Sequence, residues 1–191
     1  MTTEPAASPF THRLATTEDL PAIEALMAAA IEENMRPFLS AEEIIATRET
    51  MGVDRTLLVD GTYFLVYAGT ELVGCGGWGR RRTLYGGDHT AGRDDALSDP
   101  ATEPARIRAM YTHPRWVRRG VGTLLLELGE AAARDAGFRT IELGSTLAGE
   151  PLYRARGYVE VDREVHAGAN GSPNVVIRMR KGLVGDGAGA E

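Results

Sequence analysis

The sequence predicts a mixed α/β fold of the α+β type, and three features support this prediction. Apolar residues recur at intervals of three and four in two separate segments, which is the spacing of amphipathic helices. Short runs rich in β-branched and aromatic residues lie between turn-forming residues, as in strands. The chain has 191 residues, of which 43% are hydrophobic and 25% charged, an ordinary globular composition. We therefore expect one domain over residues 10–181, with disordered ends at 1–9 and 182–191.

The N-terminal part predicts a short strand over residues 10–14 and then two helices. Thr16 with Asp19, and Ser40 with Glu43, have the spacing of capping boxes, which mark helix starts. The second helix should extend toward Gly52. The first helix should bury one face, which comprises Leu20, Ile23, Met27, Ala30 and Ile31.

Residues 62–68 and 72–78 predict an antiparallel hairpin around a turn at Gly69. Glycines are unusual inside a strand, and the second half of this hairpin is rich in them. They indicate either a bulge or a place where another backbone or a ligand comes close. The glycines concerned are Gly74, Gly76, Gly77 and Gly79.

The C-terminal half predicts a long surface loop followed by alternating strands and helices. Residues 81–104 show no lasting periodicity and many turn formers. Strands are expected at 105–111, 140–144, 158–166 and 175–180, and a short helix at 149–155. A longer helix should span 120–136 and end before Gly137. Its expected buried stripe comprises Leu124, Leu125, Leu128 and Ala132.

Composition excludes several classes of protein. Cys75 is the single cysteine, so no internal disulfide can form, and no Cys/His cluster offers a metal site. No run approaches the roughly 18 apolar residues of a membrane span, and no secretion signal is visible. A net charge of -6 argues against a general affinity for nucleic acid. These features predict a cytoplasmic protein that binds neither membrane nor nucleic acid.

The strongest local signal is a basic turn with two glycines at the start of the 120–136 helix. The first amides of a helix have no internal partner and lie at the positive end of the helix dipole, so they can bind phosphate. Glycine lets a ligand approach, and arginine adds charge. The residues of this segment are Val117, Arg118, Arg119, Gly120, Val121, Gly122 and Thr123.

Two glycines at a helix start are weak evidence by themselves, and an ordinary helix start remains an alternative. The GxxxxGK pattern of a P-loop is absent. A dinucleotide fingerprint would place a third glycine where the chain has Leu125, although Glu142 lies at the distance of its acidic residue.

At this point the sequence resembles the GNAT family of N-acetyltransferases. The family's CoA motif is Gln or Arg, two residues, Gly, one residue, then Gly or Ala. Gly120 and Gly122 match its glycines, whereas Val117 departs from the first position. A second match is PLYRARGY, in which Tyr153 precedes Gly157 by four residues and Tyr158 follows. The resemblance covers residues 10–180 in element order. It implies a mostly antiparallel central sheet of six to seven strands flanked by helices.

The resemblance also implies an activity, in which acetyl-CoA is the co-substrate and its acetyl group passes directly to a primary amine of a small molecule or peptide. Strand amides near Met110, Tyr111 and Thr112 would hold the pantetheine arm, and Thr146 would be another CoA contact. Tyr153 would be the general acid for the sulfur. No metal is implied.

The general base is left open among four residues, Glu103, Asp99, His89 and His113, and Glu103 is kept as the candidate. Cys75 lacks an activating neighbour, so a nucleophilic role for it is weakly supported. Arg106 and Arg108 lie on a strand expected to be buried, where arginine needs an anionic partner. That partner could be a substrate carboxylate or an acid of the first two helices.

Other functions remain open at this stage. The departure at Val117 permits a non-catalytic acyl-CoA sensor or interaction module. A nucleotide-binding oxidoreductase is a more distant alternative. Exposed strand edges could pair two copies into a homodimer.

Overall fold

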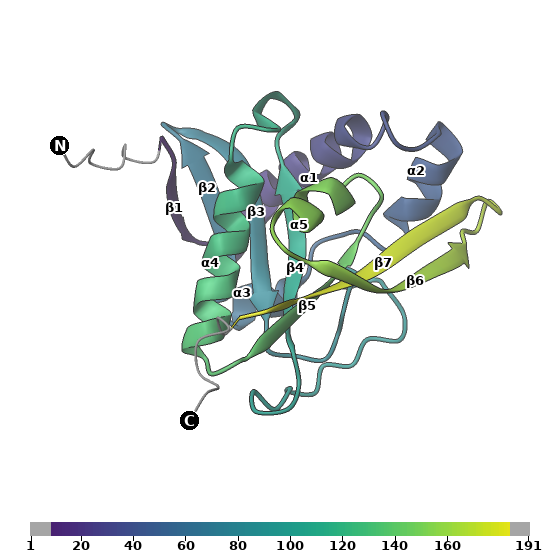
Figure 1. Cartoon of the computed structure of the whole chain (residues 1–191). Helices are drawn as coiled ribbons and strands as arrows, with labels where there is room; N and C mark the ends of the chain where they lie inside the picture. The colour runs from purple at the N-terminus through teal and green to yellow at the C-terminus, as the bar shows by residue number, and fades with distance from the viewer. Residues whose placement is uncertain (1–8, 184–191) are drawn as a thin grey trace.

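The structure is a computed structural model that describes residues 9–183; of the ends predicted to be disordered, 1–9 and 182–191, residues 1–8 and 184–191 lie outside the described residues. The prediction was wrong for Gly182, which pairs with Thr140 in the sheet. Within the described part, seven strands form one sheet in the order β1-β2-β3-β4-β5-β7-β6 (Figure 1). Every neighbouring pair is antiparallel except β4 and β5, which are parallel. The predicted fold class is therefore confirmed.

The elements follow the predicted order. The strands are β1 (Thr11–Leu14), β2 (Tyr63–Ala68), β3 (Glu71–Gly79), β4 (Ala105–Thr112), β5 (Thr140–Ser145), β6 (Val159–Ala167) and β7 (Pro173–Gly182). The α-helices are α1 (Leu20–Asn34), α2 (Ala41–Arg48), α3 (Arg55–Val59), α4 (Val121–Asp135) and α5 (Glu150–Ala155), and two 3-10 turns are η1 (Thr17–Asp19) and η2 (Pro114–Trp116). Helix α3 was not predicted, because five residues are too few to show a helical period.

Both predicted capping boxes are present. The backbone amide of Thr16 donates to the carboxylate of Asp19 at 2.8 Å, and that of Ser40 donates to Glu43 at 2.8 Å. The predicted inner face of α1 is also largely confirmed, since Ile23 is fully buried and Met27 is 4% exposed. The first box starts η1, which leads into α1, and the second starts α2, so both signals act before any tertiary contact is considered.

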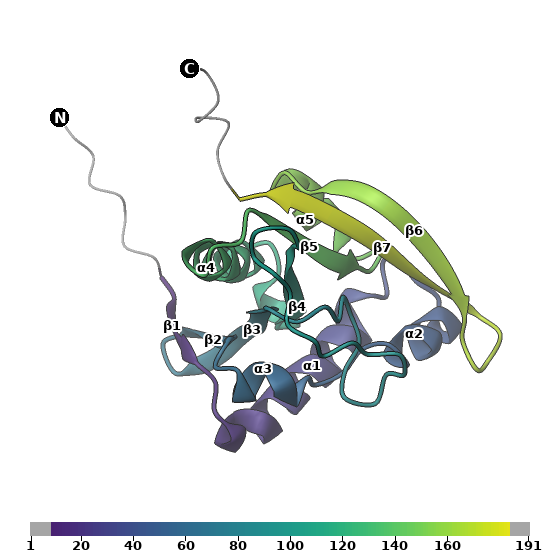
Figure 2. The same cartoon turned by 90° about the horizontal axis from the view of Figure 1, so that it is seen from below.

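Helices cover both faces of the sheet. Figure 2 shows α1, α2 and α3 on one face and α4 and α5 on the other. Helix α4 lies close to β3 because a Cβ at Gly74 would come within 2.3 Å of the Val121 side chain. Gly129 similarly makes room for Ile107, since a Cβ there would lie 2.8 Å from its Cδ1.

The expected buried stripe of α4 is wrong in three of its four positions. The residues that are buried are Val121, Leu125, Leu126, Gly129, Glu130 and Ala133. The other predicted positions are only half-buried. The prediction followed the leucines of α4 because they are the most hydrophobic residues. In the structure, close packing at Gly129 turns the adjacent face of the helix toward the sheet.

Two of the expected explanations, a bulge and close packing, account for glycines in β3. In the β3–β4 register Cys75 pairs with Tyr111 but Gly77 pairs with Arg108, so two residues of β4 oppose Gly76 alone. One of these two, Ala109, has a φ of 49°. A Cβ at Gly76 would lie 2.7 Å from the Met110 side chain. Gly76 therefore makes room for a β-bulge in β4.

Strands β4 and β5 are paired only over a short stretch. The pairs are Ala105 with Ile141 and Arg106 with Glu142. After that point β5 continues to pair with β7, as far as Ser145 opposite Ile177. The later part of β4 therefore has no strand partner on its β5 side, and the sheet opens there (Figure 1).

Buried ion pairs lie at the end of this opening where β4 and β5 are still paired. Glu142 is 0% exposed and accepts hydrogen bonds from Arg106 at 3.0 Å, from Arg178 at 2.9 Å and from Arg180 at 2.7 Å. Arg108 pairs with Asp54 at 2.7 Å. Both strand arginines thus have internal partners, which lie on β5 and before α3 instead of on the first two helices.

Residues 80–104 contain no helix or strand, only an isolated bridge between Arg81 and Leu97. Arg108 holds the start of this loop by donating to the carbonyl of Thr83 at 2.9 Å and that of Gly86 at 2.6 Å. No helix of the described residues has the length and apolar character needed to cross a membrane.

Replacing Glu142 by glutamine should destabilise the fold strongly, because three guanidinium groups would lose their shared anion. Breaking a buried ion pair costs about 3–5 kcal/mol, and the free energy of unfolding in urea would measure the loss. Glu71→Gln is the matched control, since Glu71 forms an exposed pair with Arg115 at 2.6 Å. Its cost should stay below about 1 kcal/mol. Equal losses in the two variants would contradict a structural role for the Glu142 cluster.

Candidate active site

A cleft of about 1090 Å³ occupies the opening between β4 and β5. Its lining comes from the end of α1, the bulge of β4, the start of α4, α5 and the first residues of β7. The 80–104 loop contributes only Leu84, Tyr85 and Gly86. The cleft therefore brings together segments that lie far apart in the sequence.

The start of α4 presents unpaired amides to one end of the cleft. Gly120 is the N-cap with a φ of 94°, a left-handed conformation that favours glycine, and Arg118 has a φ of 59°. No side chain caps the helix, and its first backbone bond runs from the Leu124 amide to the Gly120 carbonyl. The amides of Val121, Gly122 and Thr123 thus have no partner within the described residues. Such a terminus binds anions.

Gly122 has a packing role as well. A Cβ at this position would lie 2.8 Å from Cδ2 of Leu152, so its absence lets α5 approach α4. Gly122, Leu152 and Thr123 all line the cleft.

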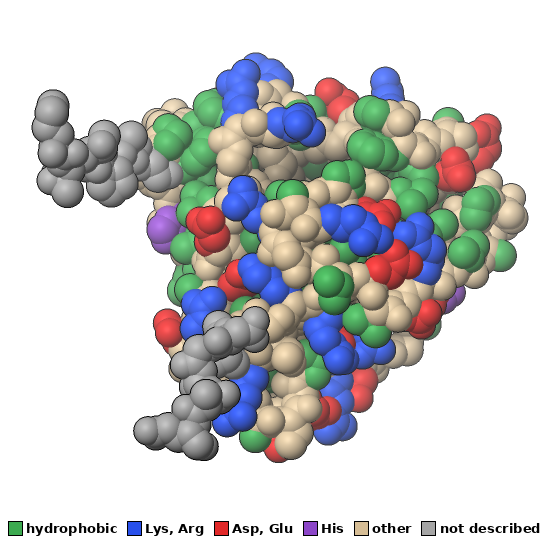
Figure 3. Space-filling model, in the orientation of Figure 1, with side chains coloured by type: hydrophobic (Ala, Val, Ile, Leu, Met, Phe, Trp, Pro, Cys, Tyr) green, Lys and Arg blue, Asp and Glu red, His purple; other side chains and the backbone are tan. Residues whose placement is uncertain are grey.

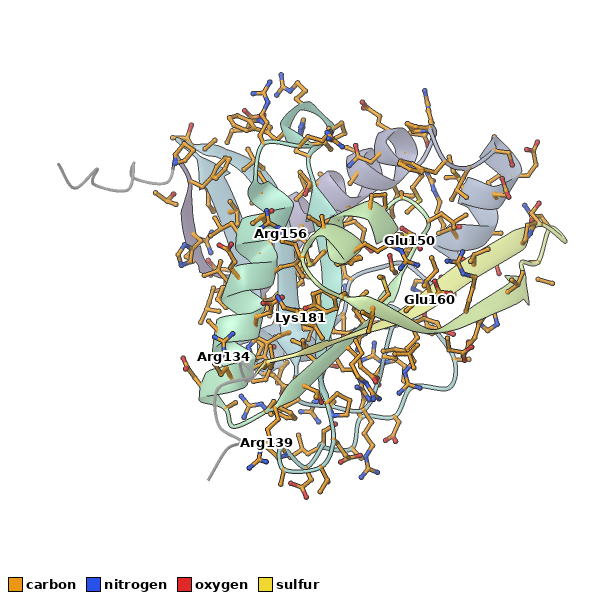
Figure 4. All side chains as sticks on the ribbon, viewed as in Figure 1. Arg134, Arg139, Glu150, Arg156, Glu160 and Lys181 are labelled. Atoms are coloured by element: carbon orange, nitrogen blue, oxygen red, sulfur yellow. The ribbon has the colours of Figure 1, made fainter. Side chains whose placement is uncertain are left out.

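Positive charge gathers at this end of the cleft. Figure 3 shows Lys and Arg side chains over the segment that precedes α4, at the top of the view. Arg118 and Arg156 line the cleft, and neither forms an ion pair within the described part of the chain. Arg156 follows α5 and lies beside α4, whereas Arg139 lies near the opposite end of that helix (Figure 4). Arg119 stacks over Trp116 at 5.1 Å.

Val117 is 42% exposed and also lines the cleft. Its side chain offers no hydrogen bond, so any anion bound here depends on the amides and the arginines.

The bulged strand supplies further backbone donors. His113 donates its amide to the carbonyl of Val73 on β3 at 2.9 Å. Because amides alternate in direction along a strand, the Tyr111 amide also faces β3, whereas those of Thr112 and Met110 face the opening. The three residues line the cleft together.

Two side chains brace the bulge. The Tyr63 hydroxyl donates to the Ala109 carbonyl at 2.7 Å, and the Asn34 amide donates to the Thr112 carbonyl at 2.8 Å. These bonds hold the carbonyls, so the strand keeps a fixed orientation at the cleft.

Tyr153 projects from α5 as a half-buried phenol on the cleft wall. Burial raises the pKa of Tyr153 to about 12, so the phenol is neutral at neutral pH and can donate a proton. Its ring packs edge-on against Tyr158, with centroids 5.9 Å apart. The Tyr158 hydroxyl in turn donates to Glu130 at 3.0 Å. Thr146 lines the same wall and accepts the Gly149 amide at 3.2 Å.

Comparison with known proteins agrees with this geometry. The model of the acetyltransferase (GNAT) family matches residues 24–158. This chain belongs to the GNAT family. The comparison with curated proteins found no match.

Solved structures share the fold. A GCN5-related N-acetyltransferase from Rhodopseudomonas palustris is 20% identical, with 94% of this chain and 99% of that chain covered and a TM-score of 0.67. A Salmonella typhimurium protein solved with its cofactor acetyl-CoA is 17% identical, with 95% and 98% covered and a TM-score of 0.61. The PaiA N-acetyltransferase of Thermoplasma acidophilum, in complex with coenzyme A, is 14% identical, with 91% and 98% covered and a TM-score of 0.58.

The four base candidates of this GNAT chain do not line the cleft. Glu103 accepts the Asp99 amide at 2.7 Å and the Arg82 side chain at 2.8 Å, and these donors lower the pKa of Glu103. His89 lines a separate hollow of about 450 Å³ beside α1. His113 uses Nδ1 to accept the Arg115 amide at 3.2 Å. Glu103, the residue kept as the candidate base, thus lies outside the cleft and is held by Arg82 and the Asp99 amide.

Glu33, near the end of α1, is the carboxylate that lines the cleft. It is exposed, and within the described residues it forms no ion pair. The sequence analysis missed it, because an acid on the polar face of an amphipathic helix looks like any solvated side chain. Only the meeting of α1 with the opening of the sheet distinguishes it.

Two other candidate chemistries have no support in this site. Cys75 is 0% exposed, and burial raises the pKa of its thiol to about 12, so it is not an activated nucleophile. Among residues 9–183, no group of three or more His, Cys, Asp or Glu side chains could hold a metal ion.

Gly120→Ala should lower the free energy of unfolding by about 1–2 kcal/mol, because a Cβ makes the left-handed conformation costly. Nothing but Phe10, at 4.0 Å, stands near the added atom, so crowding cannot explain a loss. Gly182→Ala is the control, since its φ is not left-handed and no atom lies within 4 Å of the new Cβ. Urea unfolding would measure both, and an undisturbed Gly120→Ala variant would contradict the described N-cap.

Proposed function

We propose that this GNAT protein transfers the acetyl group of acetyl-CoA directly to a primary amine. The proposal rests on how charge is distributed in the cleft. Unpaired amides and arginines stand at its α4 end, and the Glu33 carboxylate stands in the part formed by α1. An anionic cofactor and a cationic amine would therefore be attracted to different parts of the same cleft.

The cofactor would bind along the wall formed by α4 and β4. The amides of Val121, Gly122 and Thr123 would receive the diphosphate, and Arg118 and Arg156 would neutralise its charge. The outward amides of Met110 and Thr112 would hold the pantetheine arm as a strand would, since β5 no longer occupies that side of β4. Thr146 would contact the arm from the opposite wall.

The reaction requires attack by a neutral amine on the thioester carbonyl. Negative charge develops on the carbonyl oxygen, where a backbone amide of the bulge would stabilise it. The nitrogen, positively charged after the attack, would lose a proton to solvent. The carbon–sulfur bond then breaks, and Tyr153 would donate its proton to the departing thiolate and regain one from solvent. Glu33, in place of Glu103, would attract the ammonium form of the acceptor and take up its proton, directly or through water.

Arg156→Ala should weaken acetyl-CoA binding about tenfold, the effect of losing one charge-assisted hydrogen bond. Calorimetric titration with acetyl-CoA would give the Kd. Arg139→Ala removes an equally exposed arginine near the other end of α4 and should leave the Kd unchanged. Equal weakening in both variants would show a general charge effect and contradict the assigned phosphate end.

Tyr153→Phe should lower kcat roughly 10²–10⁴-fold, the usual contribution of a general acid, with little change in the Kd for acetyl-CoA. Release of free CoA thiol in the presence of an amine panel would measure turnover. Since the pKa of Tyr153 is about 12, any loss of kcat from its ionisation should begin only in strongly alkaline solution.

Tyr67→Phe is the matched control, because Tyr67 lies on β2 outside the cleft. This variant should change neither kcat nor the Kd for acetyl-CoA. A Tyr153→Phe variant that loses binding and kcat together would have a structural role instead of the acid role. Acetyl-CoA binding without thiol release from any amine would make the protein a non-catalytic acyl-CoA sensor.

A further inference from the structure

Asn174, the second residue of β7, has a polar atom that the fold leaves without a partner. The residue is 3% exposed and lines the cleft. Its Nδ2 donates to Oγ1 of Thr50, which follows α2, at 3.0 Å. Its Oδ1 is buried and accepts no hydrogen bond from the described residues.

A buried acceptor without a donor is costly, about 1–3 kcal/mol, and native folds supply such atoms with a protein, water or ligand donor. Two other buried side-chain oxygens lack partners in the described part of the chain, those of Thr90 and Ser98. Both belong to the 80–104 loop, and neither lines the cleft. Asn174 is therefore the residue among these three that combines an unsatisfied acceptor with a place in the cleft lining.

The position of Asn174 along β7 sets its place in the cleft. Ile177 pairs with Ser145, the last residue of β5, just before the wall that holds Thr146 and Tyr153. Asn174 precedes Ile177 by three residues, which at about 3.3 Å per residue places it roughly 10 Å farther along the strand. Asn174 thus lies at a distance from the reacting end of the cleft.

On the side of the cleft formed by the end of α1, the first residues of β7 and the start of the 80–104 loop, much of the lining is apolar. Apolar lining there includes Phe38, Met51, Leu84 and Val176. Glu33 is the carboxylate of the lining, whereas the nearby cation, Arg108, is already neutralised by Asp54 at 2.7 Å. An acceptor with a carboxylate or phosphate at its far end would find no free cation there, so the lining favours a cationic acceptor.

We propose that Asn174 accepts a hydrogen bond from a second amino group of the acceptor, so that the substrate class is a diamine with an apolar chain between its two nitrogens. This inference rests on the proposed acetyl transfer. One nitrogen is acetylated beside Tyr153, and the N–H of the other donates to Oδ1 of Asn174. The apolar chain lies against the side chains between them.

The test compares three acceptors of one length: octylamine, α,ω-diaminooctane and α-amino-ω-octanol. With the full chain and acetyl-CoA, kcat/KM should be about tenfold higher for the diamine than for the monoamine, the worth of one charge-assisted hydrogen bond. Asn174→Leu keeps the size of the side chain without the acceptor. It should reduce this ratio to near one.

Asn174→Asp provides a second variant, since it keeps an acceptor and adds charge, and it should raise the diamine preference. Asn170→Leu alters an amide on the same β6–β7 hairpin outside the cleft, and the ratio should stay at its native value. A wild-type ratio near one, an aminoalcohol used as well as the diamine, or equal losses for all three acceptors in Asn174→Leu would overturn the inference.

Failure of the transfer itself is distinguishable. If no amine releases CoA, the proposed function is wrong, and calorimetry with CoA present still measures binding of diaminooctane and octylamine. Tighter binding of the diamine that Asn174→Leu abolishes would support the recognition role without catalysis. Equal binding of the two amines would reject that role as well.

Discussion

Arg106 and Glu142 join β4 and β5 at the one place where the two strands pair, and the cleft exists because the pairing stops there. Glu142 is fully buried and shared with Arg178 and Arg180 of β7, so β4, β5 and β7 are tied together at that end of the sheet. Beyond it, β5 follows β7 away from β4. A buried charge cluster is a weak source of net stability, but losing its anion would leave three cations close together.

Backbone donors face the opening, which suits it to bind a ligand with hydrogen-bond acceptors. The bulge of β4 leaves the amides of Met110 and Thr112 directed toward the gap, and Asn34 and Tyr63 hold the carbonyls on the bulged segment. Helix α4 begins at the same gap with an uncapped first turn. Backbone amides cannot be lost by a change of side chain, so the departure at Val117 leaves the unpaired amides of this helix start in place.

The cleft separates two kinds of recognition. At the α4 end the donors are fixed amides and long arginines, which suit a cofactor with phosphates. In the other part the walls come from α1, the segments on either side of α2, β7 and the start of the long loop, which carry apolar side chains and few charges. We infer that the acceptor is recognised by shape, by Glu33 and by Asn174, so this part decides substrate choice.

The sequence by itself determined the local elements and singled out the helix start that we propose binds phosphate. Capping boxes, strand runs and the two glycines at the start of α4 act through residues that are close in the sequence. Their signals can therefore be recognised from the sequence alone. Tyr153 was also placed on the cleft wall, through a family motif. The prediction of the buried face of α4 was wrong, because close packing at Gly129 depends on a partner strand that is distant in the sequence.

Only the tertiary structure decided which polar residues line the cleft. Glu103 looked suitable because it lies beside a long loop, yet Arg82 and Asp99 bind it away from the cleft. Glu33 and Asn174 carry no local signal, since an acid on a helix and an amide in a strand are ordinary surface residues. Their significance arises from chain segments that meet across the open sheet, and whether a donor has a partner is known only once those segments are packed.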